Sequence, residues 1–118
     1  MRIILMLLAL VGTLGANCLE PIGCLPVVLP GVVVQVTDAT TSQAVTDATV
    51  TLTEGAYTET LIGSNGSYSG AEERPGTYTL TVTADGYQTA TVTNLVVTAD
   101  RCNVITVYRD VALQPIQQ

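Results

Sequence analysis

The feature that most constrains this chain is a two-residue alternation of apolar and hydroxyl-bearing side chains that starts at residue 31. Such alternation among β-branched residues is typical of a strand with one buried face. Segments with this pattern lie at residues 31–37, 47–53, 77–84, 89–93 and 103–113. The expected inward-facing residues are Val32, Val34, Val36, Ala48, Val50, Leu52, Tyr78, Leu80, Val82, Ala84, Ala90, Val92, Ile105, Val107, Val111 and Leu113. The sequence therefore predicts an all-β domain with a core of mostly small aliphatic residues.

Turn-forming dipeptides separate these segments. Asn65-Gly66 is typical of a tight type I′ hairpin, and Pro75-Gly76 and Asp85-Gly86 also predict turns. Short strands separated regularly by turns favour a β-sandwich over a parallel sheet. Asn65 also begins an Asn-Gly-Ser glycosylation sequon, which is a weaker interpretation of the same residues than the hairpin.

The first 16 residues have the layout of a secretory signal peptide. Arg2 precedes an apolar run from Ile3 to Val11, and small residues follow the run. The run is too short for a membrane-spanning helix, which needs about 20 residues. We therefore expect an exported protein, whether extracellular, periplasmic or anchored to the outer membrane. The expected divisions are a signal peptide (1–16), a linker or anchor segment (17–30), the β-sandwich (31–114) and a short tail (115–118).

Cys18 stands where the lipid-bearing cysteine of a bacterial lipoprotein would stand. The residues before it, Gly15 at position −3 and Asn17 at −1, fit the usual aliphatic and small pattern poorly. Cleavage by signal peptidase after Gly15 or Ala16 would instead release a free protein. Lipidation at Cys18 is therefore one of two open alternatives, and it is the only membrane attachment that the sequence suggests.

The chain has three cysteines, so one of them must remain outside any intramolecular disulfide. In one scheme Cys18 carries lipid and Cys24 pairs with Cys102. In the other, Cys18 and Cys24 close a short loop and Cys102 stays a buried thiol. The first scheme resolves the odd count and closes a long loop, for which the loop-entropy model predicts about 4 kcal/mol of stabilisation.

Composition argues against several classes of function. With a net charge of −6 and four basic residues, the chain lacks the positive surface that nucleic acids or anionic lipids require. It contains no histidine, so Ser-His and Cys-His nucleophile pairs cannot form. We expect no catalytic residues, no cofactor and no metal site. The adjacent carboxylates Glu72 and Glu73 fit a solvated turn, and the strand-end acids Asp38, Asp47, Asp85 and Asp100 fit turn formation better than Ca²⁺ binding.

A longer motif gives a more specific interpretation. Residues 75–87 read PG-x-Y-x-L-x-V-x-A-x-GY, and with residues 31–38, 47–52 and 66–68 they resemble the carboxypeptidase regulatory-like domain. The resemblance covers roughly residues 31–114 and implies a transthyretin-like, seven-stranded antiparallel Greek-key β-sandwich. It departs from the family at residues 62–66, which lack the usual aspartate. The end of the chain also resembles short bacterial surface lipoproteins, and this likeness supports the Cys24–Cys102 pairing.

The resemblance implies folding, spacing or binding of a protein or carbohydrate, and not hydrolysis. We therefore expect a non-catalytic module that binds a ligand or gives structural support at the cell envelope. One alternative is a self-assembling subunit of an extracellular filament or coat, because the threonine-rich faces carry few charges that would prevent edge pairing. Another is an accessory domain to a separate peptidase.

Overall fold

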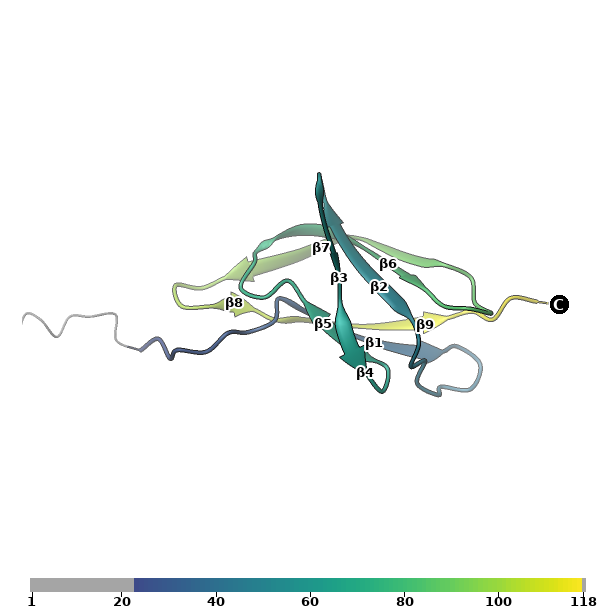
Figure 1. Cartoon of the computed structure of the whole chain (residues 1–118). Helices are drawn as coiled ribbons and strands as arrows, with labels where there is room; N and C mark the ends of the chain where they lie inside the picture. The colour runs from purple at the N-terminus through teal and green to yellow at the C-terminus, as the bar shows by residue number, and fades with distance from the viewer. Residues whose placement is uncertain (1–22, 118) are drawn as a thin grey trace, which may run out of the picture.

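A computed structural model describes residues 23–117 as two facing β-sheets (Figure 1). The predicted signal peptide and Cys18 lie outside the described residues. The first sheet contains, in spatial order, β4 (Ile62–Ser64), β5 (Ser67–Gly70), β1 (Val32–Asp38) and β9 (Val107–Leu113). The second contains β3 (Tyr57–Thr60), β2 (Thr49–Glu54), β6 (Gly76–Thr83), β7 (Ala90–Ala99) and β8 (Val104–Ile105). No segment of residues 23–117 forms a helix with the length and hydrophobicity of a membrane span.

The core lies between the two sheets and confirms the predicted alternation. Its most completely buried side chains are Val32, Val34, Val36, Val50, Leu52, Tyr78, Leu80, Val82, Leu95 and Leu113. The threonines between them face outward; Thr51, for example, stands opposite Thr81 of β6, which stands opposite Thr91 of β7. The period-two pattern therefore identified the buried face of β1, β2 and β6 because successive side chains on a pleated strand point to opposite faces.

The β-sandwich is confirmed, but the strand count and one pairing differ from the expectation. The described residues form nine strands, where the family resemblance implied seven. Most pairs are antiparallel, whereas β1 and β9 pair in parallel from Val32–Val107 to Asp38–Leu113. The first and last strands of the described chain therefore lie side by side and run in the same direction.

The prediction of one strand over residues 103–113 was wrong. The segment breaks at Thr106, whose hydroxyl donates a hydrogen bond to the carbonyl of Pro30 (2.7 Å), and the chain then moves from the second sheet into the first. This change of sheet shifts the alternation by one residue. Val104 is buried, and Ile105, expected in the core, is 52% exposed.

The turn predictions at two sites agree with the backbone. The β4–β5 hairpin has positive φ at both Asn65 (53°) and Gly66 (87°), as a type I′ turn requires. Gly86 has φ of 86°, and the Tyr87 N–H closes the turn on the carbonyl of Ala84.

The two ends of the described chain lie at opposite ends of the sandwich (Figure 1). We call residues 23–31, 71–75 and 99–106 the N-terminal pole. We call residues 38–48, 84–89 and 113–117 the C-terminal pole. The two poles carry different chemistry, and the N-terminal pole contains the first candidate site.

Candidate functional site

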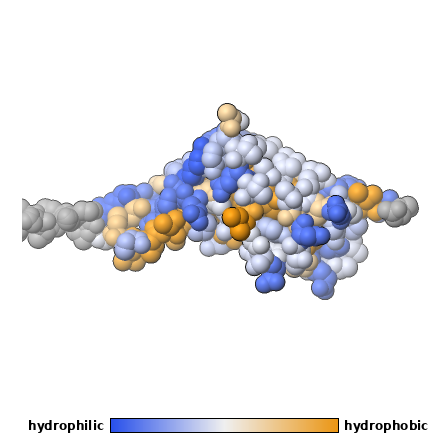
Figure 2. Space-filling view, viewed as in Figure 1, coloured by the Kyte–Doolittle hydropathy of each residue, from blue (hydrophilic) through white to orange (hydrophobic). Residues whose placement is uncertain are grey.

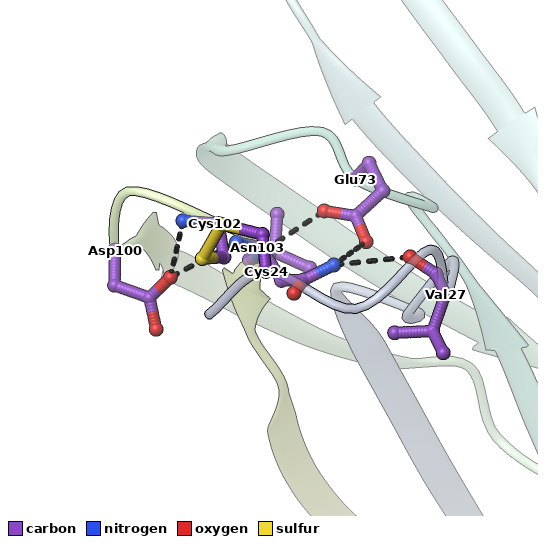
Figure 3. The surroundings of a disulfide bond; sticks show 7 residues. Cys24, Val27, Glu73, Asp100, Cys102 and Asn103 are labelled. Carbon is purple, nitrogen blue, oxygen red and sulfur yellow. Dashed lines mark hydrogen bonds between the residues drawn. A yellow bond between two sulfur atoms is a disulfide. The ribbon is translucent and has the colours of Figure 1, made fainter. Parts of the chain in front are cut away.

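A disulfide joins Cys24 to Cys102 at the N-terminal pole (Figure 3). Their Cα atoms lie 5.3 Å apart, although the residues are 78 positions apart in the sequence. The structure therefore has the Cys24–Cys102 pairing of the first scheme. The bond attaches the linker before β1 to the turn between β7 and β8, and it leaves Cys18 as the odd cysteine.

Glu73 forms a second connection between the same two segments (Figure 3). Its carboxylate accepts hydrogen bonds from the N–H of Leu29 (2.8 Å), the N–H of Val104 (3.0 Å) and the side-chain amide of Asn103 (2.5 Å). These bonds, the one from Leu29 foremost, hold the pKa of the Glu73 carboxyl below its ordinary value. The carboxylate thus joins its own turn to two segments that are far away in the sequence.

The turn that carries Cys102 is itself fixed by Asp100. One carboxylate oxygen of Asp100 accepts the N–H groups of Cys102 (2.8 Å) and Asn103 (2.9 Å), and these bonds lower the pKa of Asp100. The Asn103 side chain then donates to the carbonyl of Val27 in the linker (3.1 Å). Asp100 therefore acts as a turn-forming residue and orients the disulfide and the linker contacts.

Sequence reasoning missed the role of Glu73. The prediction placed Glu72 and Glu73 together in a solvated turn; Glu72 is exposed, but Glu73 is half-buried and hydrogen-bonded. The partners Leu29 and Val104 lie 44 and 31 positions away, so no local pattern could reveal them. The positive φ of Glu73 (47°) marks this residue in the structure as unusual.

The other predicted positions do not converge on a site. Asn65 is exposed in its hairpin turn. Asp38 accepts the N–H groups of Thr40 and Thr41 at the C-terminal pole, while Asp100 lies at the opposite pole. Among residues 23–117 there is no cluster of His, Cys, Asp or Glu that could hold a metal ion.

A second candidate site is an open depression of about 510 Å³ beside the edge strands β3 and β4. We call it the β3–β5 depression. Its lining residues are Tyr57, Glu59, Ile62, Ser69, Gly70 and Glu72. It combines two carboxylates with a tyrosine ring and the exposed side chain of Ile62 (82%). The lining residues carry two carboxylates and no basic side chain.

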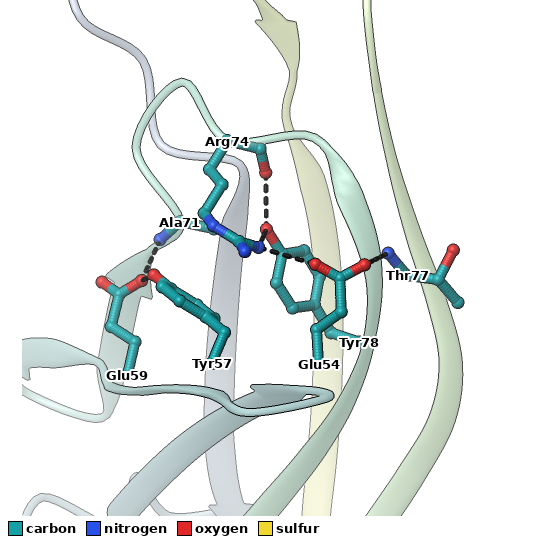
Figure 4. Close-up of polar contacts among 7 residues, drawn as sticks. All are labelled: Glu54, Tyr57, Glu59, Ala71, Arg74, Thr77 and Tyr78. Carbon is teal, nitrogen blue, oxygen red and sulfur yellow. Dashed lines mark hydrogen bonds and ion pairs between the residues drawn. The ribbon is translucent and has the colours of Figure 1, made fainter.

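Hydrogen bonds hold the wall of this depression in place (Figure 4). One oxygen of Glu59 accepts the hydroxyl of Tyr57 (2.5 Å) and the N–H of Ala71 (3.0 Å). The bond to Glu59 raises the pKa of Tyr57 to about 12. A Cβ atom at Gly70 would lie 2.6 Å from the other Glu59 oxygen, so glycine there leaves room for the carboxylate.

Arg74 packs behind the depression (Figure 4). Its guanidinium lies 3.5 Å from the ring centre of Tyr57 and donates to Glu54 (2.8 Å) and to the hydroxyl of Tyr78 (2.9 Å). The bonds to Tyr78 and Glu54 raise the pKa of Arg74, which stays charged. The Arg74 guanidinium is therefore already engaged by neighbouring side chains, and it packs against one face of the Tyr57 ring.

The family model for the carboxypeptidase regulatory-like domain matches residues 31–113. This chain belongs to that family. The family is one of non-catalytic β-sandwich modules. No curated protein shows significant similarity to the chain.

In this carboxypeptidase regulatory-like domain, the residues of the PG-x-Y…GY motif have visible structural roles. The Tyr78 hydroxyl donates to the carbonyl of Arg74 (2.6 Å) and fixes the turn into β6. Tyr87, at the end of the motif, donates to Asp38 at the end of β1 (2.6 Å). This bond lowers the pKa of Asp38 and raises that of Tyr87. The two tyrosine hydroxyls of the motif thus hold the turn into β6 and join the turn after β6 to the end of β1.

Proposed function

We propose that this domain is an envelope-anchored module, attached through its N-terminal pole and presenting the rest of the sandwich away from the membrane. The observation that carries the proposal is the Cys24–Cys102 disulfide at the pole where the chain enters. Disulfides persist in oxidising compartments outside the cytoplasm, which supports export. The pairing also leaves Cys18, the candidate lipid attachment residue, as the odd cysteine of the chain.

The geometry of the sandwich supports this orientation. Tension on the linker passes through the disulfide directly to Cys102, so the covalent bond and not the β1 hydrogen bonds carries it into the fold. The C-terminal pole lies at the far end of the sandwich (Figure 1). An anchor on the N-terminal side would therefore leave the strand edges and the β3–β5 depression accessible.

Intact-mass spectrometry of the protein purified from its native envelope tests the anchor. We expect a chain that begins at Cys18, carries a diacylglyceryl group there, and weighs about 2 Da less than the reduced form because one disulfide is closed. A Cys18→Ser variant should lose the lipid mass and keep the disulfide. A native chain that begins at Ala16 or Asn17 without lipid would overturn the anchor proposal.

A second candidate function is binding of a basic partner in the β3–β5 depression. Glu59 and Glu72 supply negative charge, and Ile62 supplies an apolar contact for the methylene chain of a lysine. NMR titration with a capped tetralysine peptide tests this. We expect shifts confined to the lining residues and weakened by Glu72→Gln, with Asp85→Asn as the control. Shifts spread over the whole acidic surface would contradict a defined site.

The filament alternative requires an edge strand that can pair with another copy. β9 is an edge strand of the first sheet, but it carries the exposed charges of Arg109 and Asp110. Charges on an edge strand oppose pairing between molecules, so they argue against a filament that is built through β9. Size-exclusion chromatography with negative-stain imaging separates the two: a monomer at high concentration supports the module, and ordered fibres support the filament.

A further inference from the structure

Three apolar side chains are exposed next to the disulfide at the N-terminal pole. Leu25, Val27 and Val28 are 71%, 45% and 65% exposed. Figure 2 shows apolar residues gathered at this end of the molecule. We call these three residues the apolar pole surface. Aliphatic side chains next to one another and exposed to solvent are a feature of interaction sites.

The structure holds this surface in a fixed conformation. Its backbone is attached at one end by the Cys24 disulfide and at the other by the hydrogen bond from Leu29 to Glu73. Between them, the Val27 N–H donates to the carbonyl of Leu25 (2.8 Å), and the Val27 carbonyl accepts from Asn103. Because the backbone is already ordered, binding through these side chains costs little further conformational entropy.

The sequence limits how far this surface lies from a lipid on Cys18. Cys24 is six positions after Cys18, and a fully extended chain of that length spans at most about 20 Å. If Cys18 carries the anchor that we propose above, Cys24 lies within that distance of the bilayer, and the apolar pole surface begins at the next residue. This inference therefore rests on the proposed function for its position.

We propose that the apolar pole surface is a second membrane contact, in which Leu25, Val27 and Val28 enter the interfacial region of the bilayer. The two carboxylates that face this linker region, Glu73 and Asp100, are both engaged by N–H donors. The net charge of −6 opposes binding to anionic lipid. The partner that fits is thus a zwitterionic lipid surface, bound by burial of apolar area.

This contact has a consequence for orientation. A lipid chain alone tethers the domain but leaves it free to tilt. Insertion of three side chains at the pole would hold the long axis of the sandwich away from the membrane and keep the C-terminal pole distal.

The test uses the full exported chain with Cys18→Ser, so that membrane binding is measured without any lipid anchor. The chain contains no tryptophan. A Val27→Trp substitution therefore adds a single fluorescent reporter to the surface, and Ile62→Trp places the same reporter at an exposed apolar position on β4. With phosphatidylcholine vesicles we expect a blue shift, and quenching by brominated lipid, for the first variant only.

Removal of the neighbouring side chains measures the strength of the contact. Adding Leu25→Ser and Val28→Ser to the Val27→Trp protein should lower its vesicle partition coefficient about tenfold, because two aliphatic side chains no longer enter the bilayer. Vesicles that contain phosphatidylglycerol should bind the protein more weakly than phosphatidylcholine alone.

Three results would overturn the proposal. The first is equal vesicle response of the Val27→Trp and Ile62→Trp proteins. The second is a partition coefficient unchanged by the two serine substitutions. The third is a concentration-dependent blue shift without vesicles, which would make a second copy of the chain the occupant of the surface. Since Cys18 is absent from all these proteins, none of these results bears on whether the native chain is lipidated.

Discussion

The two poles of the sandwich are fastened by different chemistry. At the N-terminal pole a covalent bond and the Glu73 carboxylate join the linker to the turn after β7. At the C-terminal pole the hydroxyl groups of Tyr68 and Tyr87 hold the loop after β1 and the turn after β6. A disulfide survives local unfolding, whereas a hydroxyl hydrogen bond opens with its segment. Of the two ends, the one at which the described chain enters the sandwich is therefore the one that is fastened covalently.

Removing the covalent bond should have the largest effect. The double variant Cys24→Ser/Cys102→Ser opens a loop of 78 residues, and we expect a loss of about 4 kcal/mol in the free energy of unfolding, since the unfolded chain gains entropy. Urea denaturation measures the loss, with Cys18→Ser as the control that should leave stability unchanged. An unchanged unfolding midpoint in the double variant would remove the basis for treating the N-terminal pole as the stronger end.

Removal of the Tyr68 hydroxyl alone should destabilise the C-terminal pole. The buried Tyr68 hydroxyl accepts the N–H of Ala48 (3.0 Å) and donates to the carbonyl of Val45 (2.9 Å). Tyr68→Phe leaves both backbone groups without this partner and should cost about 1–3 kcal/mol. Tyr108→Phe, at a position that is 71% exposed, is the matched control. Equal stability of the two variants in urea would show that the hydroxyl does not hold this pole.

Loss of the Glu73 charge should loosen the linker without unfolding the sandwich. We expect Glu73→Gln to speed hydrogen exchange of the Leu29 and Val104 amides about tenfold, because a neutral amide accepts hydrogen bonds more weakly than a carboxylate. Exchange in β6 should not change. Glu72→Gln, at the exposed neighbour, is the control. Slow exchange retained at Leu29 would mean that the disulfide alone orders the linker.

Acid should destabilise both poles, and we expect this effect to be smaller than those of the substitutions above. The folded-state pKa values of Glu73 and Asp38 are lowered from 4.5 and 3.8, so the unfolded state binds protons first as the pH falls. The stabilisation from these groups is therefore present above those values and is lost as the pH falls through the lowered folded pKa. Unfolding midpoints measured between about pH 6 and pH 3 should fall less steeply for Glu73→Gln than for the parent. Identical slopes would contradict the Glu73 contribution.

The sequence predicted those parts of the fold that depend on neighbouring residues. Alternation along β6 located Tyr78, Leu80 and Val82 in the core, and Asn65-Gly66 located a hairpin. Alternation failed at Ile105, where the chain changes sheets within one residue. It also failed to show β3 and β5, because their burial depends on what they pack against more than on their own pattern.

For the candidate sites, too, the sequence predicted one part and the fold decided the rest. The sequence analysis left two pairing schemes open, and only the fold brought Cys24 and Cys102 within bonding distance. Nothing near Glu73 in the sequence indicated that it would meet Leu29 and Val104. The sequence likewise did not single out the apolar pole surface. The structure shows that its side chains are exposed beside the disulfide.

The sequence by itself determined the all-β class, the inner face of the main strands and the family to which the domain belongs. These properties follow from pleat geometry and turn conformation, which act over a few residues. The tertiary structure alone decided the parallel pairing of β1 with β9 and the chemistry of the two poles. Those contacts join residues tens of positions apart, and which residues meet depends on the path of the whole chain between them.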